Sequence, residues 1–237
     1  MAPPKKLPSA SKSSRADIDR FVKRVNAMAP HRGGSTSGRL LFAMDATMSR
    51  QPTWDRALHV QADMFKAAIA VGNLEIQLAY FRGFGEFRAS RWLSDAQSLA
   101  NAMSGVACRG GHTQIERVLN HALNSAQRDK LKAVVYVGDC VEESADDLAA
   151  LAGQLGVFGV PIFAFQEGHD PAAETVFREL ARLSGGAFSR FSASSADQLR
   201  DLLSAVAVFV AGGQAALMDY SQKRPQAVKG LLTQLKR

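Results

Sequence analysis

The chain has 237 residues, of which 46% are hydrophobic and 22% charged, an ordinary composition for a soluble globular protein. This length is enough for one α/β domain with a sizeable core or for two very small domains. Two cysteines do not make a disulfide scaffold and favour a cytoplasmic protein with reduced thiols. We also expect no secretory signal and no membrane span, because the longest apolar run, residues 202–217, is interrupted by polar residues and is shorter than the roughly 20 residues that a spanning helix needs.

The net charge of +7 is concentrated at the two ends of the chain. Residues 1–24 carry +5 and residues 214–237 carry +4, which leaves −2 for the segment between them. We expect residues 1–16, which are rich in Pro, Ser and Lys, to be a disordered basic tail, and residues 214–237 to be a basic C-terminal extension. A basic chain suggests nucleic acid or an acidic surface as a partner, but here that argument applies only to the ends.

After a predicted helix and loop over residues 17–38, apolar runs alternate with amphipathic stretches as far as residue 213. Strands that alternate with helices and are apolar on both faces predict a largely parallel sheet covered on both sides, a Rossmann-like doubly wound α/β fold. The predicted strands are residues 39–44, 74–81, 85–92 (a hairpin partner at an edge), 131–138, 160–165 and 186–191.

Apolar side chains at helical spacing predict the helices between these strands. One helix should begin after Ser94 as its N-cap, and another after Ser144, with Asp147 three residues further on. The faces expected to be buried are Trp54, Leu58, Phe65 and Ile69; Ile115, Val118, Leu119 and Ala122; Leu148, Leu151, Ala152 and Leu155; Val176, Leu180 and Leu183; and Leu199, Leu202, Leu203 and Val206.

Three groups of polar side chains follow predicted strands or a glycine loop. Asp45, Thr47 and Ser49 belong to "DATMS" after the first strand, Thr113 lies in the loop "CRGGHT", and Asp139 ends the fourth strand. Because sites in such folds form at the carboxyl ends of the strands, we expect these side chains to lie together. Carboxylate and hydroxyl oxygens are hard ligands, which suit Mg²⁺ or Mn²⁺ and disfavour Zn²⁺ or copper.

The D-x-T-x-S sequence, the Gly-Gly-x-Thr loop and the aspartate that closes the fourth strand together resemble the von Willebrand factor type A (VWA) family over residues 39–213. The resemblance is closest to its bacterial intracellular members. It implies a sheet order of 3-2-1-4-5-6 with one antiparallel edge strand, and a metal-ion-dependent adhesion site (MIDAS). Thr47, Ser49 and Thr113 would then be hydroxyl ligands, and Asp45 and Asp139 would bind the metal directly or through water. Two departures are Thr47 in place of the usual serine and "GDCVEES" in place of the more common Thr-Asp-Gly ending.

The same resemblance implies a protein-interaction module rather than an enzyme. An acidic side chain of a protein partner would complete the coordination of Mg²⁺ or Mn²⁺, and we expect an intracellular scaffold or adaptor. Two alternatives remain open. The basic ends are compatible with binding nucleic acid, as in the RNA-binding Ro proteins that carry this fold. A phosphoryl-transfer enzyme of the haloacid dehalogenase kind would want a second carboxylate at position 47, where this chain has threonine.

Other polar residues surround the predicted site in the sequence. Cys108 and Cys140 are expected in nearby loops, as two unrelated thiols rather than a redox pair. Glu142 and Glu143 belong to an acidic stretch before a helix and either serve the helix start or attract the cation and partner. His112 has no evident partner in the sequence and is expected to be solvated.

Overall fold

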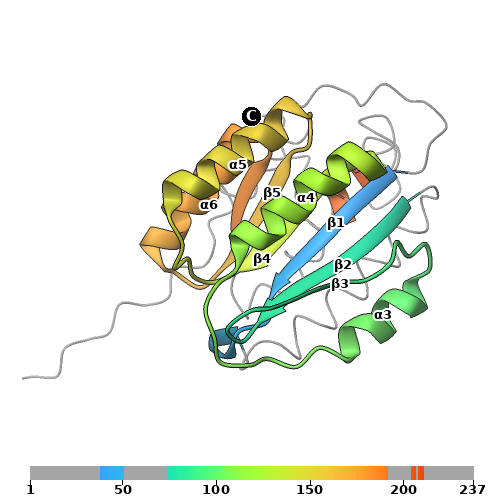
Figure 1. Cartoon of the computed structure of the whole chain (residues 1–237), viewed down its shortest axis with the longest axis horizontal. Coiled ribbons are helices and arrows are strands. Elements are labelled where there is room, and N and C mark those ends of the chain that lie inside the picture. Colours follow the sequence, from blue (N-terminus) through green and yellow to red (C-terminus); the bar gives the residue numbers. More distant parts are fainter. Residues whose placement is uncertain (1–37, 51–73, 192–203, 207, 211–237) are drawn as a thin grey trace, which may run out of the picture.

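The structure is a computed structural model that describes residues 38–50, 74–191, 204–206 and 208–210. Over these residues the strands form one six-stranded sheet of order β3-β2-β1-β4-β5-β6 (Figure 1). All neighbouring strands are parallel except β3, which runs antiparallel to β2 at the edge. The predicted fold class and sheet order are therefore confirmed. The strands are β1 (Gly38–Asp45), β2 (Leu74–Arg82), β3 (Glu86–Ala89), β4 (Leu131–Gly138), β5 (Ile162–Glu167) and β6 (Ala187–Phe191).

Helices cover both faces of the sheet. In Figure 1, α4, α5 and α6 lie side by side across one face, while α3 lies on the other side near β2. None of the described helices is long and apolar enough to cross a membrane. The helices are η1 (Met48–Arg50), α3 (Ala96–Ser104), α4 (Ile115–Asp129), α5 (Ala145–Val157) and α6 (Pro171–Leu183).

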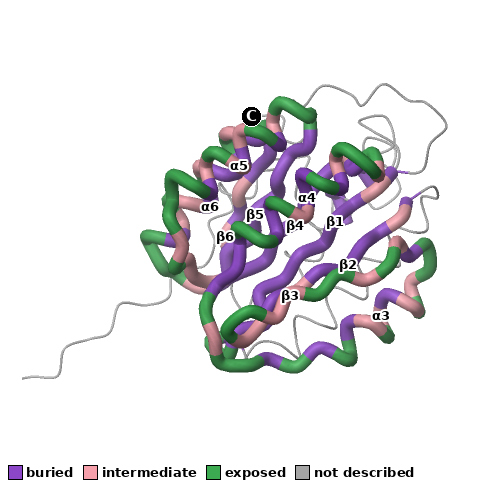
Figure 2. Tube along the Cα trace, viewed as in Figure 1, coloured by how far each residue is buried: buried purple, intermediate pink, exposed green. Residues whose placement is uncertain are grey.

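Strand β1 shows how the sequence pattern produces two cores. Leu40 and Phe42 pack with α3 and with the helical residues around Val206, whereas Leu41 and Ala43 pack against the face covered by α4, α5 and α6. All four are completely buried, which explains why the strand is an unbroken apolar run instead of an alternating one. Burial along the central strands and exposure on the outer helix surfaces are visible in Figure 2.

The predicted helix faces are mostly confirmed where the structure describes them. The four residues expected to be buried on α4 are buried, as are Leu148, Ala152 and Leu155 on α5, whereas Leu151 is only partly buried. On α6 the prediction was partly wrong, because Leu180 is buried with Ala173 and Phe177, while Val176 and Leu183 are partly buried at the edges.

One predicted helix start is wrong and another is confirmed. The N-cap of α3 is Asp95, not Ser94, since the Asp95 side chain accepts a hydrogen bond from the Ser98 amide at 2.7 Å. An aspartate caps as well as a serine does, and its charge is favourable at the positive end of the helix dipole. Ser144 caps α5 as predicted, by accepting from the Asp147 amide.

Several predictions fall outside the described residues. These are the basic tail and extension, most of the segment 17–38, the helix expected over Trp54 to Ile69, and Leu199, Leu202 and Leu203. The boundaries of the domain predicted over residues 39–213 remain a prediction as well.

Candidate metal centre

Asp45 is the last residue of β1, and its position in the middle of the sheet buries it completely. Its Oδ1 accepts a hydrogen bond from the Thr47 amide at 2.7 Å, an Asx-type turn that bends the chain out of the strand. The Thr47 and Ser49 hydroxyl oxygens lie 3.1 Å apart in the same turn. Asp45 Oδ2 has no hydrogen-bond partner among the described residues. A buried carboxylate oxygen without a partner is unfavourable, which makes this oxygen a candidate ligand atom.

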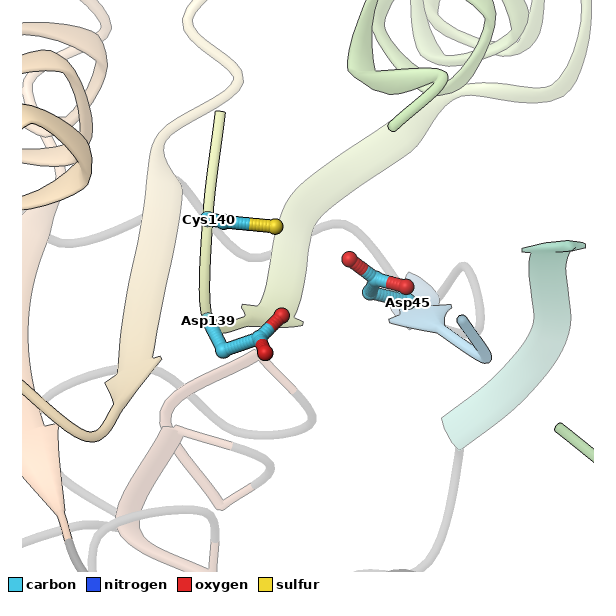
Figure 3. Close-up of side chains that lie close together, drawn as sticks. All are labelled: Asp45, Asp139 and Cys140. Atoms are coloured by element: carbon cyan, nitrogen blue, oxygen red, sulfur yellow. The ribbon is translucent and has the colours of Figure 1, made fainter. Parts of the chain in front are cut away.

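The residues that follow β4 face Asp45, because β4 is the direct parallel neighbour of β1. One ligand atom each of Asp45, Asp139 and Cys140 lies within 4.8 Å of the other two. Figure 3 shows the Asp45 carboxylate pointing across the gap toward the Asp139 carboxylate and the Cys140 sulfur. Asp139 Oδ1 is a second buried carboxylate oxygen without a described partner. The structure therefore brings the two predicted aspartates together and adds a cysteine that the sequence analysis did not include.

The electrostatics of this cluster favour a cation. Burial raises the pKa of Asp45 from 3.8 to about 6, opposed by the hydrogen bonds from Thr47 and the charge of Arg50, and reinforced by Asp139. Burial, followed by the charges of Asp139 and Asp45, raises the pKa of the Cys140 thiol to about 12. Both shifts arise chiefly from burial, and the neighbouring carboxylates add to each, so the cluster disfavours negative charge in the absence of a bound cation.

Arg50 lies beneath the cluster and ties three strands together. Its guanidinium is completely buried and donates to Glu167 at 3.0 Å and to the main-chain carbonyls of Asp45 at 2.8 Å and Val137 at 3.4 Å. The contacts join the carboxyl ends of β1, β4 and β5, which fixes the two strands that carry Asp45 and Asp139. No sequence signal indicated this role, because an arginine one residue beyond "DATMS" looks like a surface residue.

Thr113 lies in the loop before α4 and is bound to the loop that follows β4. Its hydroxyl donates to Glu143 at 2.6 Å and accepts from the Glu142 amide at 2.9 Å, and its own amide donates to the Glu142 carboxylate at 2.8 Å. Glu143 also accepts from the Glu116 amide at the start of α4 at 2.9 Å. The Thr113 hydroxyl thus uses its hydrogen in the bond to Glu143 and one lone pair in the bond from the Glu142 amide. The second lone pair of its oxygen remains for another partner. Its part in a metal site stays a prediction.

The other residues considered from the sequence have specific surroundings. Glu142 and Glu143 hold the Thr113 loop, a structural role that the sequence analysis did not weigh. His112 is exposed as expected, but it is not merely solvated, since its Nδ1 lies 3.1 Å from Glu142 and its ring contacts Phe84. Cys108 is buried in the core face shared with α3, and no disulfide joins it to Cys140.

Comparison with known proteins gives a clear answer for the fold. No family model matches the sequence, and no curated protein matches it. Among solved structures, a von Willebrand factor type A protein from Catenulispora acidiphila aligns with a TM-score of 0.58 and 16% identity over 73% of this chain and 43% of that one. The SpRpn10 VWA domain aligns with a TM-score of 0.54 and 14% identity over 69% of this chain and 94% of that one. This chain has the VWA fold. An aerotolerance-related membrane protein from Bacteroides fragilis also aligns, with a TM-score of 0.54 and 16% identity over 68% of this chain and 94% of that one.

The donor set at this edge of the sheet fits a divalent cation. Asp45 and Asp139 lie close together and each has a buried carboxylate oxygen without a described partner, and the Thr47 and Ser49 hydroxyls lie in the turn that begins at Asp45. Two carboxylates supply the charge that balances a divalent ion, and the hydroxyls supply neutral oxygens. A candidate ligand cluster is therefore present at the end of the sheet where ligands bind in open α/β folds.

Proposed function

We propose that this VWA domain is a metal-ion-dependent protein-interaction module. Asp45 and Asp139 hold Mg²⁺ or Mn²⁺, directly or through water, and Thr47, Ser49 and Thr113 contribute hydroxyl oxygens. An acidic side chain of a protein partner completes the coordination. The observation that carries this proposal is that Asp45 and Asp139, at the ends of neighbouring strands, lie within 4.8 Å of each other by one ligand atom each. Each also has one buried carboxylate oxygen without a hydrogen-bond partner among the described residues.

The charge balance explains why such a site would bind a carboxylate from a partner. Without a cation, Asp45 and Asp139 repel any further acid and raise each other's free energy. A bound divalent ion neutralises both, and it needs more oxygen ligands than two aspartates provide, since Mg²⁺ takes six. A partner's carboxylate then replaces a bound water and supplies one of these further oxygen ligands.

The surface beside the cluster suits a partner that is acidic and partly apolar. Met48 in the DATMS turn is 52% exposed, and Phe84 at the β2–β3 turn is 82% exposed. Arg109 forms a β-bridge with Thr47 and carries an exposed guanidinium, and His112 packs edge-on against Phe84 with ring centroids 5.2 Å apart. Exposed aromatic and methionine side chains next to basic groups are typical of binding surfaces. We propose that they flank the acidic residue of the partner.

The test is unfolding of the full chain by denaturant in EDTA, Mg²⁺ or Mn²⁺. A cation at 100 times its dissociation constant should stabilise the wild type by about 2.7 kcal/mol. Asp45→Asn should abolish this gain, whereas Asp146→Asn, which removes an exposed acid at the start of α5, should keep it. An equal gain in wild type and Asp45→Asn, or no gain in the wild type, would refute the site.

A partner assay follows from the same variants. Binding of a candidate acidic peptide should require the cation, vanish in EDTA and be absent in Asp45→Asn. No observation on the described residues favours the two alternatives: the basic ends proposed to bind nucleic acid lie outside those residues, and position 47 carries a hydroxyl where phosphoryl transfer would want a carboxylate.

A further inference from the structure

We propose that Cys140 is a sulfur ligand through which this site binds a thiophilic divalent cation such as Zn²⁺, in competition with Mg²⁺. The inference rests on the proposed cation site and concerns its metal preference. A site built from oxygen alone suits Mg²⁺ or Mn²⁺ better than Zn²⁺, but one thiolate changes the ligand set to one that zinc prefers and Mg²⁺ does not use.

The distances allow the sulfur to share an ion with the two carboxylates. Zinc binds carboxylate oxygen at about 2.1 Å and thiolate sulfur at about 2.3 Å, so two such ligands at a tetrahedral angle lie roughly 3.6 Å apart. The ligand atoms of Asp45, Asp139 and Cys140 already lie within 4.8 Å of one another. Movements of about 1 Å at the side-chain tips separate this spacing from the bonded one. Both residues sit in the loop after β4, where such adjustment requires no movement of the strands.

A second observation, independent of the cysteine, points to a ligand in the space between Asp45 and Asp139. Asp45 is completely buried, its carboxylate points into the gap, and its Oδ2 has no hydrogen-bond partner among the described residues. Its other oxygen is held by the Thr47 amide, so the carboxylate cannot turn away without losing that bond. Asp45 is thus a fixed acceptor opposite Asp139 and Cys140 (Figure 3).

The placement of Cys140 differs from that of the other cysteine in a way that suits a ligand. Cys108 is 6% exposed and packs among apolar side chains of the core, as a small hydrophobic residue does. Cys140 is half-buried, and its sulfur lies within 4.8 Å of a carboxylate oxygen of Asp45 and of Asp139. Partial exposure gives an ion a route to the sulfur, and the two aspartates attract it.

The binding step balances in protons and charge. The Cys140 S–H bond breaks, its proton passes to the buffer, and the sulfur forms a bond to the metal without any change in oxidation state. Two carboxylates and one thiolate give three negative charges against the two positive charges of the ion. The remaining position of a four-coordinate zinc is then open to water or to a neutral group of a partner.

Co²⁺ is the probe of choice, because thiolate coordination produces a sulfur-to-cobalt charge-transfer absorption that oxygen ligands do not. The full chain is titrated with Co²⁺ as wild type, Cys140→Ser and, as the matched control, Cys108→Ser. Wild type and Cys108→Ser should show the band, and Zn²⁺ should remove it by displacing the cobalt. Cys140→Ser should lack the band and bind Co²⁺ at least about 10-fold more weakly, since even second-shell losses reduce metal affinity roughly 10- to 100-fold.

Absence of the band in the wild type, or its persistence in Cys140→Ser, would overturn the inference. Alkylation of the wild-type chain by iodoacetamide, read by mass spectrometry, is a check that needs no variant: Zn²⁺ should protect Cys140, and Mg²⁺ should not. Equal alkylation with both ions would also overturn it. If Mg²⁺ stabilises wild type and Cys140→Ser equally and no sulfur band appears, the role of Cys140 is refuted and the proposed function stands. If no cation stabilises the wild type, the role of Cys140 and the proposed function are both refuted.

Discussion

Replacement of Asp45 by asparagine should stabilise the cation-free protein, although it removes the residue on which the proposed site depends. The folded chain raises the pKa of Asp45 from 3.8 to about 6, chiefly through burial. Above pH 6 the side chain is therefore ionised in an environment that disfavours its charge. The difference between the folded and the ordinary pKa of Asp45, at about 1.36 kcal/mol per pKa unit, corresponds to about 3 kcal/mol. This is the stability that ionisation of Asp45 removes from the folded state.

The sign of the pH dependence follows from proton linkage. Between pH 4 and pH 6 the folded chain holds the Asp45 proton and the unfolded chain does not, so stability from this group is complete below pH 4 and is lost as the pH rises through 6. Asparagine keeps the shape, can still accept from the Thr47 amide and does not titrate. The stability of Asp45→Asn minus that of wild type should thus grow from near zero at pH 4 to about 3 kcal/mol at pH 8.

The assay is urea unfolding of both proteins in EDTA at several pH values, repeated with saturating Mg²⁺. A stabilisation of this size should raise the midpoint in a thermal scan by roughly 6–12 °C for a chain of this length. Saturating Mg²⁺ should reduce or reverse the difference, because only the wild type gains from the ion. A variant less stable than wild type in EDTA at pH 8, or a difference that does not change with pH, would refute the reasoning.

Three further substitutions test the surrounding architecture. Gly111→Ala should destabilise the chain by about 1–3 kcal/mol and weaken cation binding, since a Cβ there would lie 2.0 Å from the Gly83 carbonyl oxygen, whereas Gly110→Ala, with nothing within 4 Å, should change neither. Arg50→Met should cost about 3–5 kcal/mol in urea unfolding, because it leaves a buried glutamate without its partner. Thr113→Val should cost about 1–3 kcal/mol through the lost hydroxyl bonds to two glutamates, and Thr113→Ser should retain most of the stability. Wild-type stability in any of the three disruptive variants would contradict the contacts assigned to it.

The sheet could be predicted because its signals are local. Each central strand is a short run of apolar residues, and both its faces are buried by helices whose own spacing shows in the sequence, as with Ile115 and Val118 on α4. The two aspartates could be placed together for a related reason: each directly follows a strand, and parallel neighbours end at the same edge. The order of the strands came from the resemblance, not from the pattern.

The rest of the site depends on contacts between distant positions, which no local pattern encodes. Arg50 and Glu167 are 117 residues apart and meet because β1, β4 and β5 are neighbours in that register. Thr113 and Glu143 are 30 residues apart and meet because both loops leave the same edge of the sheet. Cys140 had one available signal, its place directly after Asp139, but whether its sulfur turns toward or away from the aspartates depends on the loop conformation.

Arg50 lies close to Asp45 but does not donate to its carboxylate in any described hydrogen bond. A guanidinium beneath a buried carboxylate would ordinarily pair with it and remove the need for any other cation. Here the Arg50 guanidinium bonds Glu167 and reaches only the main-chain carbonyl of Asp45, and Asp45 Oδ2 keeps no hydrogen-bond partner among the described residues. Glu167 therefore holds the Arg50 Nε, while Asp45 Oδ2 accepts no hydrogen bond from a described residue. A Glu167→Gln variant should weaken that pairing, free the guanidinium to turn toward Asp45, and so lower the affinity for Mg²⁺ in a titration without removing any proposed ligand. Unchanged affinity for Mg²⁺ in that variant would show that the unpaired state of Asp45 does not depend on Glu167.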